Sequence, residues 1–544
     1  MPDLWLRLLF VAGPSGYIVS RRFLGYLRYF QQEGYEPIRF FRWTKLRSLT
    51  DPALWLSMLA GIVLPSAPIV AALLFATVIV VGLVQPNARR SGKIPLRLTA
   101  RARRILGVSL LLAFVLWTSA VRPGGRLDVQ RALIALSFLL AFSPVTLVAA
   151  NALLVPYERH VQGVFEADAR SRVSAIEPFI IGITGSYGKS SSKGMLAHIL
   201  QFHAPTLAAS GSINTLMGIT RHIRENLVHG HKYMVVEMGA FKRGSIQRLC
   251  ELTPPSAGLI TAVGDMHLER FGSTEEIVRA KSELAQALPR GGLLVVNADS
   301  EGALRIAKGA NQCKVILYGE RSVEDLDVRV SAILFSRRGT TFELQTKTRR
   351  YRCFTPLLGR PIILNLAGVF ALTVALGLPE DLVVAAMRTL EPVSNRLEVV
   401  EDGDLTWIKD AYNSNQFGFR AALEVASALP ARRRFLITPG VVELGAQQFS
   451  VNKVLAYEAS TICDRTVVVS QTNREAFIEG CREAGREDRL IPVANRTEAF
   501  RWIRDTAEKG DVVILENDLP DLYEHVSGFF WPTRSSRVLK APQS

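Results

Sequence analysis

The sequence predicts an α-helical membrane region followed by two α/β domains. Several long apolar runs in the first 160 of its 544 residues carry no charge, which is typical of helices that cross a membrane. After them, short β-like apolar runs alternate with helical patterns, and this alternation indicates parallel sheets. One of these strands meets its helix through a glycine-punctuated turn, as phosphate-binding loops do. We therefore expect a P-loop central domain with a parallel sheet and a Rossmann-like C-terminal domain.

The predicted membrane region covers residues 1–160 and would contain about four membrane segments. Its uncharged runs are residues 52–88, 105–121 and 132–155, while residues 4–20 are apolar apart from one arginine. The 105–121 and 132–155 runs are close to the roughly 20 residues that cross a bilayer, and prolines divide the 52–88 run into two short spans. Buried core helices are the alternative, but these runs have no polar face.

Basic residues lie beside these apolar runs. Seven of them fall within residues 89–104, and such clusters mark the inner loops of membrane proteins. We therefore assign the net charge of +16 to membrane topology, with a lipid bilayer as partner and no nucleic acid. This predicts an integral membrane protein of the cytoplasmic membrane with its catalytic domains in the cytoplasm. Five cysteines without CxxC spacing indicate neither a disulfide framework nor a structural zinc site.

Two further domains are expected after this region, at residues 175–392 and 393–544. The boundary follows from the spacing of motifs near residues 392–395. Residues 328–354 carry short alternating runs that predict a β-hairpin excursion from the parallel sheet. The other strands are expected at residues 233–238, 256–263, 292–296, 314–318, 434–437, 465–470 and 511–515.

The glycine-punctuated turn follows an apolar run and precedes a helical pattern. Its glycines allow backbone N–H groups to close around phosphate oxygens, and the helix N-terminus adds partial positive charge. Lys189 is expected to reach the β- and γ-phosphates of a nucleotide, and the Ser190 hydroxyl to bind Mg²⁺. Ile183 stands where the general motif has glycine, so an ordinary glycine-rich turn is the alternative. The flanking strand and helix patterns favour a nucleotide site.

Other polar residues follow the ends of predicted strands. Glu237 ends an apolar strand, where ligands bind in open α/β sheets, and its carboxylate could hold Mg²⁺. The next strand leads to Asp265 and His267, and Lys281 lies on the helix that follows. Each has an ordinary alternative when taken singly: a solvated glutamate, a structural histidine, and a lysine that keeps its charge in solvent.

Together these motifs resemble those of the Mur ligase family. The resemblance is carried by TGxxGKS at residues 184–190, by Glu237, His267 and Lys281 in that order, and by the segments SNRLEVV and DAYNSN. The family contains ATP-dependent amide ligases that build cell-wall peptides, and related members make poly-γ-glutamate or polyglutamylate folate. The resemblance covers residues 176–519 and implies ATP and Mg²⁺ as cofactors.

The resemblance also implies roles for individual residues. Glu237 would bind a first Mg²⁺ and His267 a second, and Lys281 would be carbamylated and orient that second ion. Arg396 would reach the γ-phosphate, while Asp410 would hold the ribose or orient the arginine. The expected catalytic residues are Lys189, His267, Lys281 and Arg396, and the expected metal ligands are Ser190, Glu237, His267 and Lys281. The expected nucleotide-binding residues are Thr184, Gly185, Ser186, Gly188, Lys189, Ser190, Ser191, Asn365, Arg396 and Asp410.

Three features depart from the family pattern. Pro361 and Ile362 replace the His and Asn of the segment beside the adenine, although Asn365 is retained. Acidic residues within 516–521 replace a basic segment, which would suit a cationic acceptor unless they form a solvated turn. Residues 1–160 take the place of the family's soluble domain that binds the UDP sugar.

The sequence therefore predicts an ATP-dependent amide ligase that works through an acyl phosphate, in cell-envelope peptide synthesis. The segments DAYNSN and PGVVELG favour the branch of the family that adds D-alanyl-D-alanine. Its substrates would be a carboxylate and an amine from envelope peptide precursors. Two alternatives stay open. One is a ligase of another acid, as in poly-γ-glutamate synthesis or with a lipid-linked carboxylate, and the other is a membrane scaffold that binds ATP without catalysis.

Overall fold

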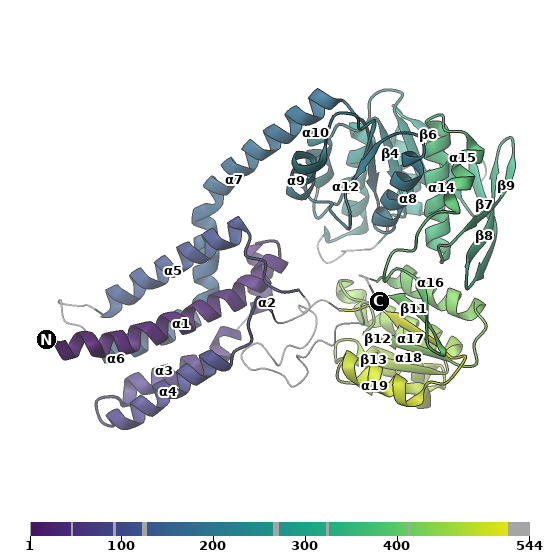
Figure 1. Cartoon of the computed structure of the whole chain (residues 1–544). Coiled ribbons are helices and arrows are strands. Elements are labelled where there is room, and N and C mark those ends of the chain that lie inside the picture. Colours follow the sequence, from purple (N-terminus) through teal and green to yellow (C-terminus); the bar gives the residue numbers. More distant parts are fainter. Residues whose placement is uncertain are drawn as a thin grey trace. The chain divides into compact units, whose positions relative to one another are not determined.

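The computed structural model describes residues 2–44, 47–90, 94–121, 128–264, 271–321, 326–411 and 414–519. Within these ranges the chain forms two compact units (Figure 1). The first is helical and ends at Val161, and the second is α/β and covers Gln162–Leu519.

The helical unit is built from α-helices around an apolar core. Phe23 and Phe30 of the first helix are fully buried there, together with Leu136 of a later one. Arg22 is also buried, and its guanidinium is satisfied by the Asp51 carboxylate at 2.7 Å and by the Gln85 side chain. The helices are α1 Pro2–Gln32, α2 Pro37–Thr44, α3 Pro52–Val63, α4 Pro68–Val84, α5 Ala100–Val121, α6 Val129–Ala141 and α7 Ser143–Ile176, the last of which continues into the second unit.

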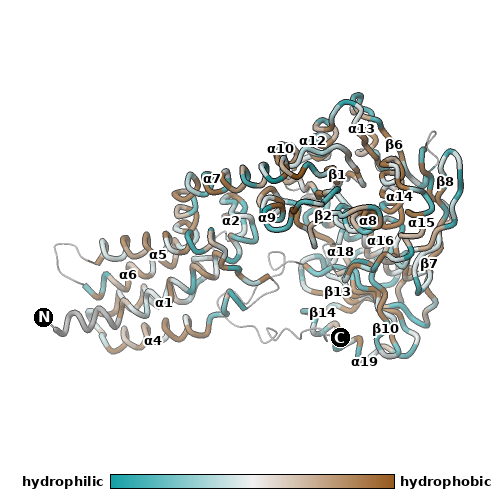
Figure 2. Tube along the Cα trace, turned by 45° about the horizontal axis from the view of Figure 1, so that its top comes forward, coloured by the Kyte–Doolittle hydropathy of each residue, from teal (hydrophilic) through white to brown (hydrophobic). Residues whose placement is uncertain are grey.

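The predicted integral membrane protein with about four membrane segments is wrong. Among the described residues, α5 is the one helix long and apolar enough to cross a bilayer. The number of possible spans rises to two if the bent pair of α6 and α7 is counted as a single span. The uncharged run 52–88 folds as α3 and α4, which have 12 and 17 residues and are shorter than a span. The helices α6 and α7 meet at an angle of 69°. Apolar character is visible along α4, α5 and α6 (Figure 2), but the helix lengths do not support the predicted topology.

A nine-stranded sheet forms the first part of the second unit. Its order is β2-β3-β1-β4-β5-β6-β7-β8-β9, parallel from β2 to β7 and antiparallel from β7 to β9. The antiparallel strands are the excursion predicted at residues 328–354. The strands are β1 Phe179–Thr184, β2 Thr206–Ala208, β3 Tyr233–Glu237, β4 Ala257–Ile260, β5 Leu293–Asn297, β6 Lys314–Gly319, β7 Val328–Ser336, β8 Gly339–Thr346 and β9 Arg350–Thr355.

Helices cover both faces of this sheet. Because successive strand residues point to opposite faces, Ile181 and Ile183 of β1 pack on one side and Ile180 on the other. The first side is covered by α8 Lys189–Gln201, α14 Arg360–Ala375 and α15 Glu380–Met387. The second is covered by α9 Leu216–Asn226, α10 Ser245–Leu252, α12 Thr274–Ala287 and α13 Glu301–Gly309.

A six-stranded sheet forms the last part of the second unit, in the order β10-β11-β15-β12-β13-β14. The pair β10–β11 is antiparallel and the other pairs are parallel. The strands are β10 Glu398–Asp402, β11 Leu405–Asp410, β12 Arg434–Thr438, β13 Arg465–Val469, β14 Leu490–Val493 and β15 Val512–Glu516, and the helices α16 Gln416–Ala428, α17 Gln448–Ile462, α18 Arg474–Glu483 and α19 Arg496–Thr506. The predicted N-terminal helical region and the two α/β parts are thus confirmed.

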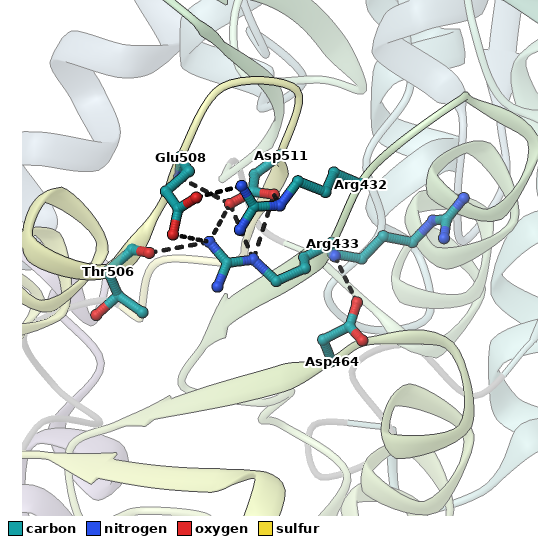
Figure 3. Close-up of polar contacts among 7 residues, drawn as sticks. Arg432, Arg433, Asp464, Thr506, Glu508 and Asp511 are labelled. Atoms are coloured by element: carbon teal, nitrogen blue, oxygen red, sulfur yellow. Dashed lines mark hydrogen bonds and ion pairs between the residues drawn. The ribbon is translucent and has the colours of Figure 1, made fainter.

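Ion pairs hold the amino ends of these strands together (Figure 3). The fully buried Asp511, just before β15, accepts a hydrogen bond from Arg433 Nη2 at 2.6 Å. Glu508 pairs with Arg432, and the Asp464 carboxylate accepts the Arg434 backbone N–H at 2.8 Å. This polar network lies at the edge opposite to the carboxyl ends of the strands, which are the ends that bind ligands in parallel sheets.

Candidate active site

The turn between β1 and α8 requires glycine at two positions. Gly185 has φ of +155°, and a Cβ there would lie 1.9 Å from Thr261 Oγ1. Gly188 has φ of +79°, and a Cβ there would lie 2.2 Å from the side-chain amide of Asn365. Asn365 is buried on α14, so this predicted residue packs directly against the turn. The close approach of both neighbours fixes the path of the backbone.

Hydrogen bonds fasten this turn to the end of β4. Ser186 N–H donates to the Ala262 carbonyl at 2.7 Å, and Ser186 Oγ donates to the Gly264 carbonyl at 2.8 Å. On the other side, the Thr184 hydroxyl donates to the Met238 carbonyl at 3.0 Å. The turn is therefore anchored to both strands that flank β1.

Two lysines donate to the same carbonyl of this turn. Lys189 Nζ lies 2.7 Å from Gly185 O and 3.2 Å from Ser186 O, and Lys281 Nζ lies 2.9 Å from Gly185 O. Burial lowers the pKa of Lys189, and burial together with the nearby charge of Lys189 lowers the pKa of Lys281 well below its usual range. Two lysine amino groups that converge in this way supply N–H donors for an anionic ligand at the turn.

Glu237 supplies a buried carboxylate beside these lysines, at the carboxyl end of β3. Its Oε1 accepts a hydrogen bond from Asn214 Nδ2 at 3.0 Å, and its Oε2 lies 3.2 Å from Lys193 Nζ. Sequence reasoning missed the part played by Lys193. The available signal was its position four residues after Lys189, which places both on one face of α8.

Serines and an arginine complete the rim of the turn. Ser190 Oγ lies 3.2 Å from Ser212 Oγ, and Ser191 Oγ accepts a hydrogen bond from Arg396 Nη1 at 3.4 Å. Arg396 precedes the second sheet, so a residue of one α/β part reaches the glycine turn of the other. The predicted His267 and Asp265 lie in residues 265–270, outside the described residues.

Arg396 is held by an unusual stretch of backbone. The flanking residues Asn395 and Leu397 both have positive φ, at 58° and 49°, which is costly for residues other than glycine. Asp410 accepts the Leu397 backbone N–H at 3.3 Å. Burial raises the pKa of Asp410 to about 7, although the Leu397 N–H and the Arg396 charge oppose that shift. Asp410 therefore lies where it fixes the backbone next to the arginine.

A pocket of about 330 Å³ lies beside the turn. It is lined by α8, by the segment that leads into α14, and by the residues around Arg396. Its apolar wall includes Met195, Ile362 and Val393, and its polar groups include His198 and Glu391. This mixture of apolar and polar groups suits a partly polar ring.

Comparisons with known proteins identify the family. Residues 183–373 match the model of the Mur ligase middle domain, and residues 395–516 match that of the Mur ligase glutamate ligase domain. UDP-N-acetylmuramoyl-tripeptide--D-alanyl-D-alanine ligase from Escherichia coli is 31% identical over 344 residues, which are 63% of this chain and 72% of that protein. The chain belongs to the Mur ligase family. It is thus an ATP-dependent, ADP-forming ligase, which confirms the predicted class of enzyme.

Other relatives agree with this assignment. The ligase of the same name from Mycobacterium tuberculosis strain H37Rv is 29% identical over 365 residues, covering 62% of this chain and 70% of that protein. The structure of MurF from Acinetobacter baumannii has a TM-score of 0.60 at 24% identity, over 68% of this chain and 79% of that one. MurF from Thermotoga maritima, solved with ADP, also has a TM-score of 0.60, at 21% identity over 68% and 83%. These two structures show that the fold is shared.

Two of the acidic residues within 516–521, Glu516 and Asp518, do not form a solvated turn, and Asp521 lies outside the described residues. Glu516 is fully buried and accepts hydrogen bonds from the hydroxyls of Ser414 and Thr438, the latter at 2.9 Å. Asp518 pairs with Arg496 at 2.9 Å. The Glu516 carboxyl therefore links Ser414 to the end of β12.

The oxygen donors of this Mur ligase fit a hard divalent cation. The Glu237 carboxylate and the Ser190 hydroxyl are both close to the glycine turn, and Mg²⁺ prefers one or two such ligands with phosphate oxygens and water. Within the described ranges no cluster of three His, Cys, Asp or Glu side chains could hold a metal by itself. The fit is therefore to an ion bound together with a phosphate, and not to a closed protein cage.

Proposed function

We propose that this Mur ligase joins a carboxyl group of a cell-envelope peptide precursor to an amine, as the names of its relatives describe for UDP-N-acetylmuramoyl-tripeptide and D-alanyl-D-alanine. The proposal rests chiefly on the convergence of Lys189, Lys281 and Arg396 on one glycine turn with the Glu237 carboxylate beside it. The 31% identity to the Escherichia coli ligase supports the same substrate class.

The reaction would proceed in two steps. An oxygen of the donor carboxylate attacks the γ-phosphorus of ATP, the bond to the β–γ bridging oxygen breaks, and ADP leaves. The amine then attacks the acyl carbon, the bond to the phosphate oxygen breaks, and inorganic phosphate leaves while the nitrogen gives up a proton. Lys189 and Arg396 are suited to neutralise the charge on the transferring phosphoryl group. The backbone held by Asp410 would keep Arg396 directed at that group.

Mg²⁺ would supply further neutralisation of the phosphate oxygens. We propose Ser190 and Glu237 as its protein ligands, with the predicted His267 as ligand of a second ion. We also propose that Lys281 is carbamylated, because its low pKa favours the neutral amine that reacts with CO₂. The resulting anion would pair with the Lys189 ammonium, which donates to the same Gly185 carbonyl. Mass spectrometry of the native protein, with and without bicarbonate, tests this modification.

The pocket beside α8 is proposed to hold the nucleoside base. Ile362 lines it where the family pattern has an amide, so an apolar contact would replace a hydrogen bond. His198 and Glu391 offer polar groups to a base from the same pocket. Ser191 and Arg396, which also line this pocket, would then lie on the phosphate side of the nucleotide. We also propose that the two α/β parts are separate domains, a P-loop domain at residues 175–392 and a Rossmann-like domain at residues 393–544.

A ligase of another acid is the second candidate. Residues 1–160 lie outside the segments that match the family models. They take the place of the soluble domain that binds the UDP sugar in the family pattern, so the donor could be a different acid. Poly-γ-glutamate synthesis and a lipid-linked carboxylate therefore stay as predictions for the donor. A lipid partner also stays a prediction. Apolar side chains exposed on the helical unit are Trp55, Leu59, Ile62, Ile69, Leu73, Leu83, Leu111 and Phe114.

A steady-state assay of the full-length chain tests the proposed function. ADP release is measured with UDP-N-acetylmuramoyl-tripeptide and D-alanyl-D-alanine, and separately with glutamate as both donor and acceptor. We expect amine-dependent ADP release with the first pair and its loss in Lys189→Ala, because the β- and γ-phosphates lose their cation. The exposed Lys308→Ala on α13 is the matched control and should behave as the wild type. Equal activity of Lys189→Ala and wild type would refute the proposal.

A further inference from the structure

Lys193 forms a buried ion pair next to the proposed magnesium ligand. Its side chain is 4% exposed, that of Glu237 is 1% exposed, and Nζ lies 3.2 Å from Glu237 Oε2. Nζ also donates to the Gly211 carbonyl. Lys189, one turn earlier on α8, donates instead to Gly185 and Ser186, so the two lysines serve different segments.

The carbonyl that Lys193 contacts belongs to a segment beside the glycine turn. This segment, residues 211–214, follows β2 and contains Asn214, whose amide donates to the second oxygen of Glu237 at 3.0 Å. The Asn214 carbonyl also accepts the Gly239 N–H at 3.1 Å, directly after β3. Ser212 meets Ser190 at 3.2 Å. The segment is thus attached to α8 and β3 through groups that surround one carboxylate.

Burial explains why this arrangement depends on the lysine. A carboxylate removed from water is costly unless it is paired and hydrogen-bonded, and Lys193 is the cation that contacts Glu237 in the described ranges. Without the ammonium, the Glu237 carboxylate would lose its partner and turn toward solvent. The Gly211 carbonyl would be released as well, because the same Nζ holds both groups.

We propose that Lys193 is a positioning residue that couples the divalent-cation site at Glu237 to the 211–214 segment. The inference rests on the proposed function, which assigns Glu237 to Mg²⁺. Groups that orient a metal ligand commonly change metal affinity or activity by about 10- to 100-fold when they are removed. A joint effect on cation affinity and on the backbone of this segment distinguishes this role from simple support of the fold.

The test uses the full-length chain with Lys193→Met, which keeps the length of the side chain and removes its charge, and with Lys193→Arg, which keeps the charge. Mn²⁺ binding to the protein saturated with ADP is measured by electron paramagnetic resonance, and hydrogen exchange of residues 209–215 by mass spectrometry. We expect Lys193→Met to weaken Mn²⁺ binding about tenfold and to speed exchange in this segment, and Lys193→Arg to recover part of both. Lys453→Met removes a distant lysine that pairs with Glu479 and Glu483, and it is the control.

Kinetics give the second readout. In Lys193→Met we expect the Mg²⁺ concentration that gives half-maximal rate to rise about tenfold while the KM for the amine stays within about twofold of wild type. Unchanged Mn²⁺ affinity and unchanged exchange in a folded Lys193→Met would overturn the inference, as would tighter Mn²⁺ binding. If Lys193→Met does not fold, Lys193→Gln replaces it and the same criteria apply. Absence of ligase activity in the wild type would contradict the proposed function alone, because Mn²⁺ binding and exchange are measured without turnover.

Discussion

Asp410 and Glu516 lie directly opposite each other on the parallel strands β11 and β15, and both carboxyl groups are buried. Burial raises the pKa of Asp410 to about 7, and burial and the nearby Asp410 raise the pKa of Glu516 well above its usual range. Two neighbouring carboxyl groups in a buried place are not both ionised without a large cost. Glu516 is therefore expected to keep its proton to a higher pH than a solvated glutamate does, while the pKa of Asp410 is about 7.

Glu516→Gln should make the stability of the protein less dependent on pH. The folded pKa of Glu516 is above its ordinary value of 4.5, so stability is greatest below pH 4.5 and falls as the pH rises toward the folded pKa. The slope from one such group is at most about 1.4 kcal/mol per pH unit. The amide keeps the contacts to Ser414 and Thr438 and cannot ionise. Thermal unfolding from pH 5 to 8 should show a smaller decrease for Glu516→Gln, and an identical slope in both proteins would contradict the assignment.

Asp410→Asn should remove a pH dependence of activity. We expect kcat/KM to rise with pH through about 7, because the ionised carboxylate holds the backbone beside Arg396. The amide lacks this charge, so activity should be about 10- to 100-fold lower and the ascending limb should be absent. The exposed Asp402→Asn on β10 provides the control. A wild-type profile that is flat between pH 6 and 8 would rule out this role.

Gly188→Ala should weaken nucleotide binding and lower the stability of the protein. The added Cβ would meet the Asn365 amide at 2.2 Å on a backbone with φ of +79°, so the turn or α14 must shift. Nucleotide affinity, measured by isothermal titration calorimetry, should fall by more than about tenfold. Gly309→Ala is the matched control because its Cβ would enter open space at the end of α13. Retention of normal affinity in Gly188→Ala would show that the turn is not the phosphate site.

The sequence was informative where local chemistry decides the structure. Glycines between a strand pattern and a helix pattern indicated the turn that Gly185 and Gly188 form, and the ordered positions of Glu237 and Lys281 indicated the family. Burial was not visible in the same way. Lys193 reads as one more charged residue on a helix, and Glu516 reads as part of an acidic turn, yet both are buried by contacts with segments distant in the sequence.

The error on the membrane region has a different physical origin. An uncharged run in a sequence indicates that a segment is hydrophobic, but it does not predict the length of the helix that the segment forms. The prolines in residues 52–88 predicted the break between α3 and α4, but the end of α6 at Ala141, before α7 begins in a new direction, was not predicted. Breaks of this kind depend on local backbone geometry and on packing with other helices, which composition does not record.

Phe417→Ala should slow turnover and leave the fold intact. The centroid of the Phe417 ring lies 5.1 Å from the centroid of the Tyr187 ring in the glycine turn. This contact connects the start of α16, beside the six-stranded sheet, to the glycine turn of the nine-stranded sheet. Gly264 lies against the Tyr187 ring, so the contact is supported from the end of β4. Because Phe417 is 47% exposed, its loss should change the unfolding temperature little.

We expect kcat of Phe417→Ala to fall to about a third or less of the wild-type value. Nucleotide affinity should be preserved, because the substitution affects the closure of the two α/β parts and does not affect nucleotide binding. Phe449→Ala, at another exposed ring on α17, is the control, and equal kcat values for Phe417→Ala and Phe449→Ala would exclude a role of this contact in closure.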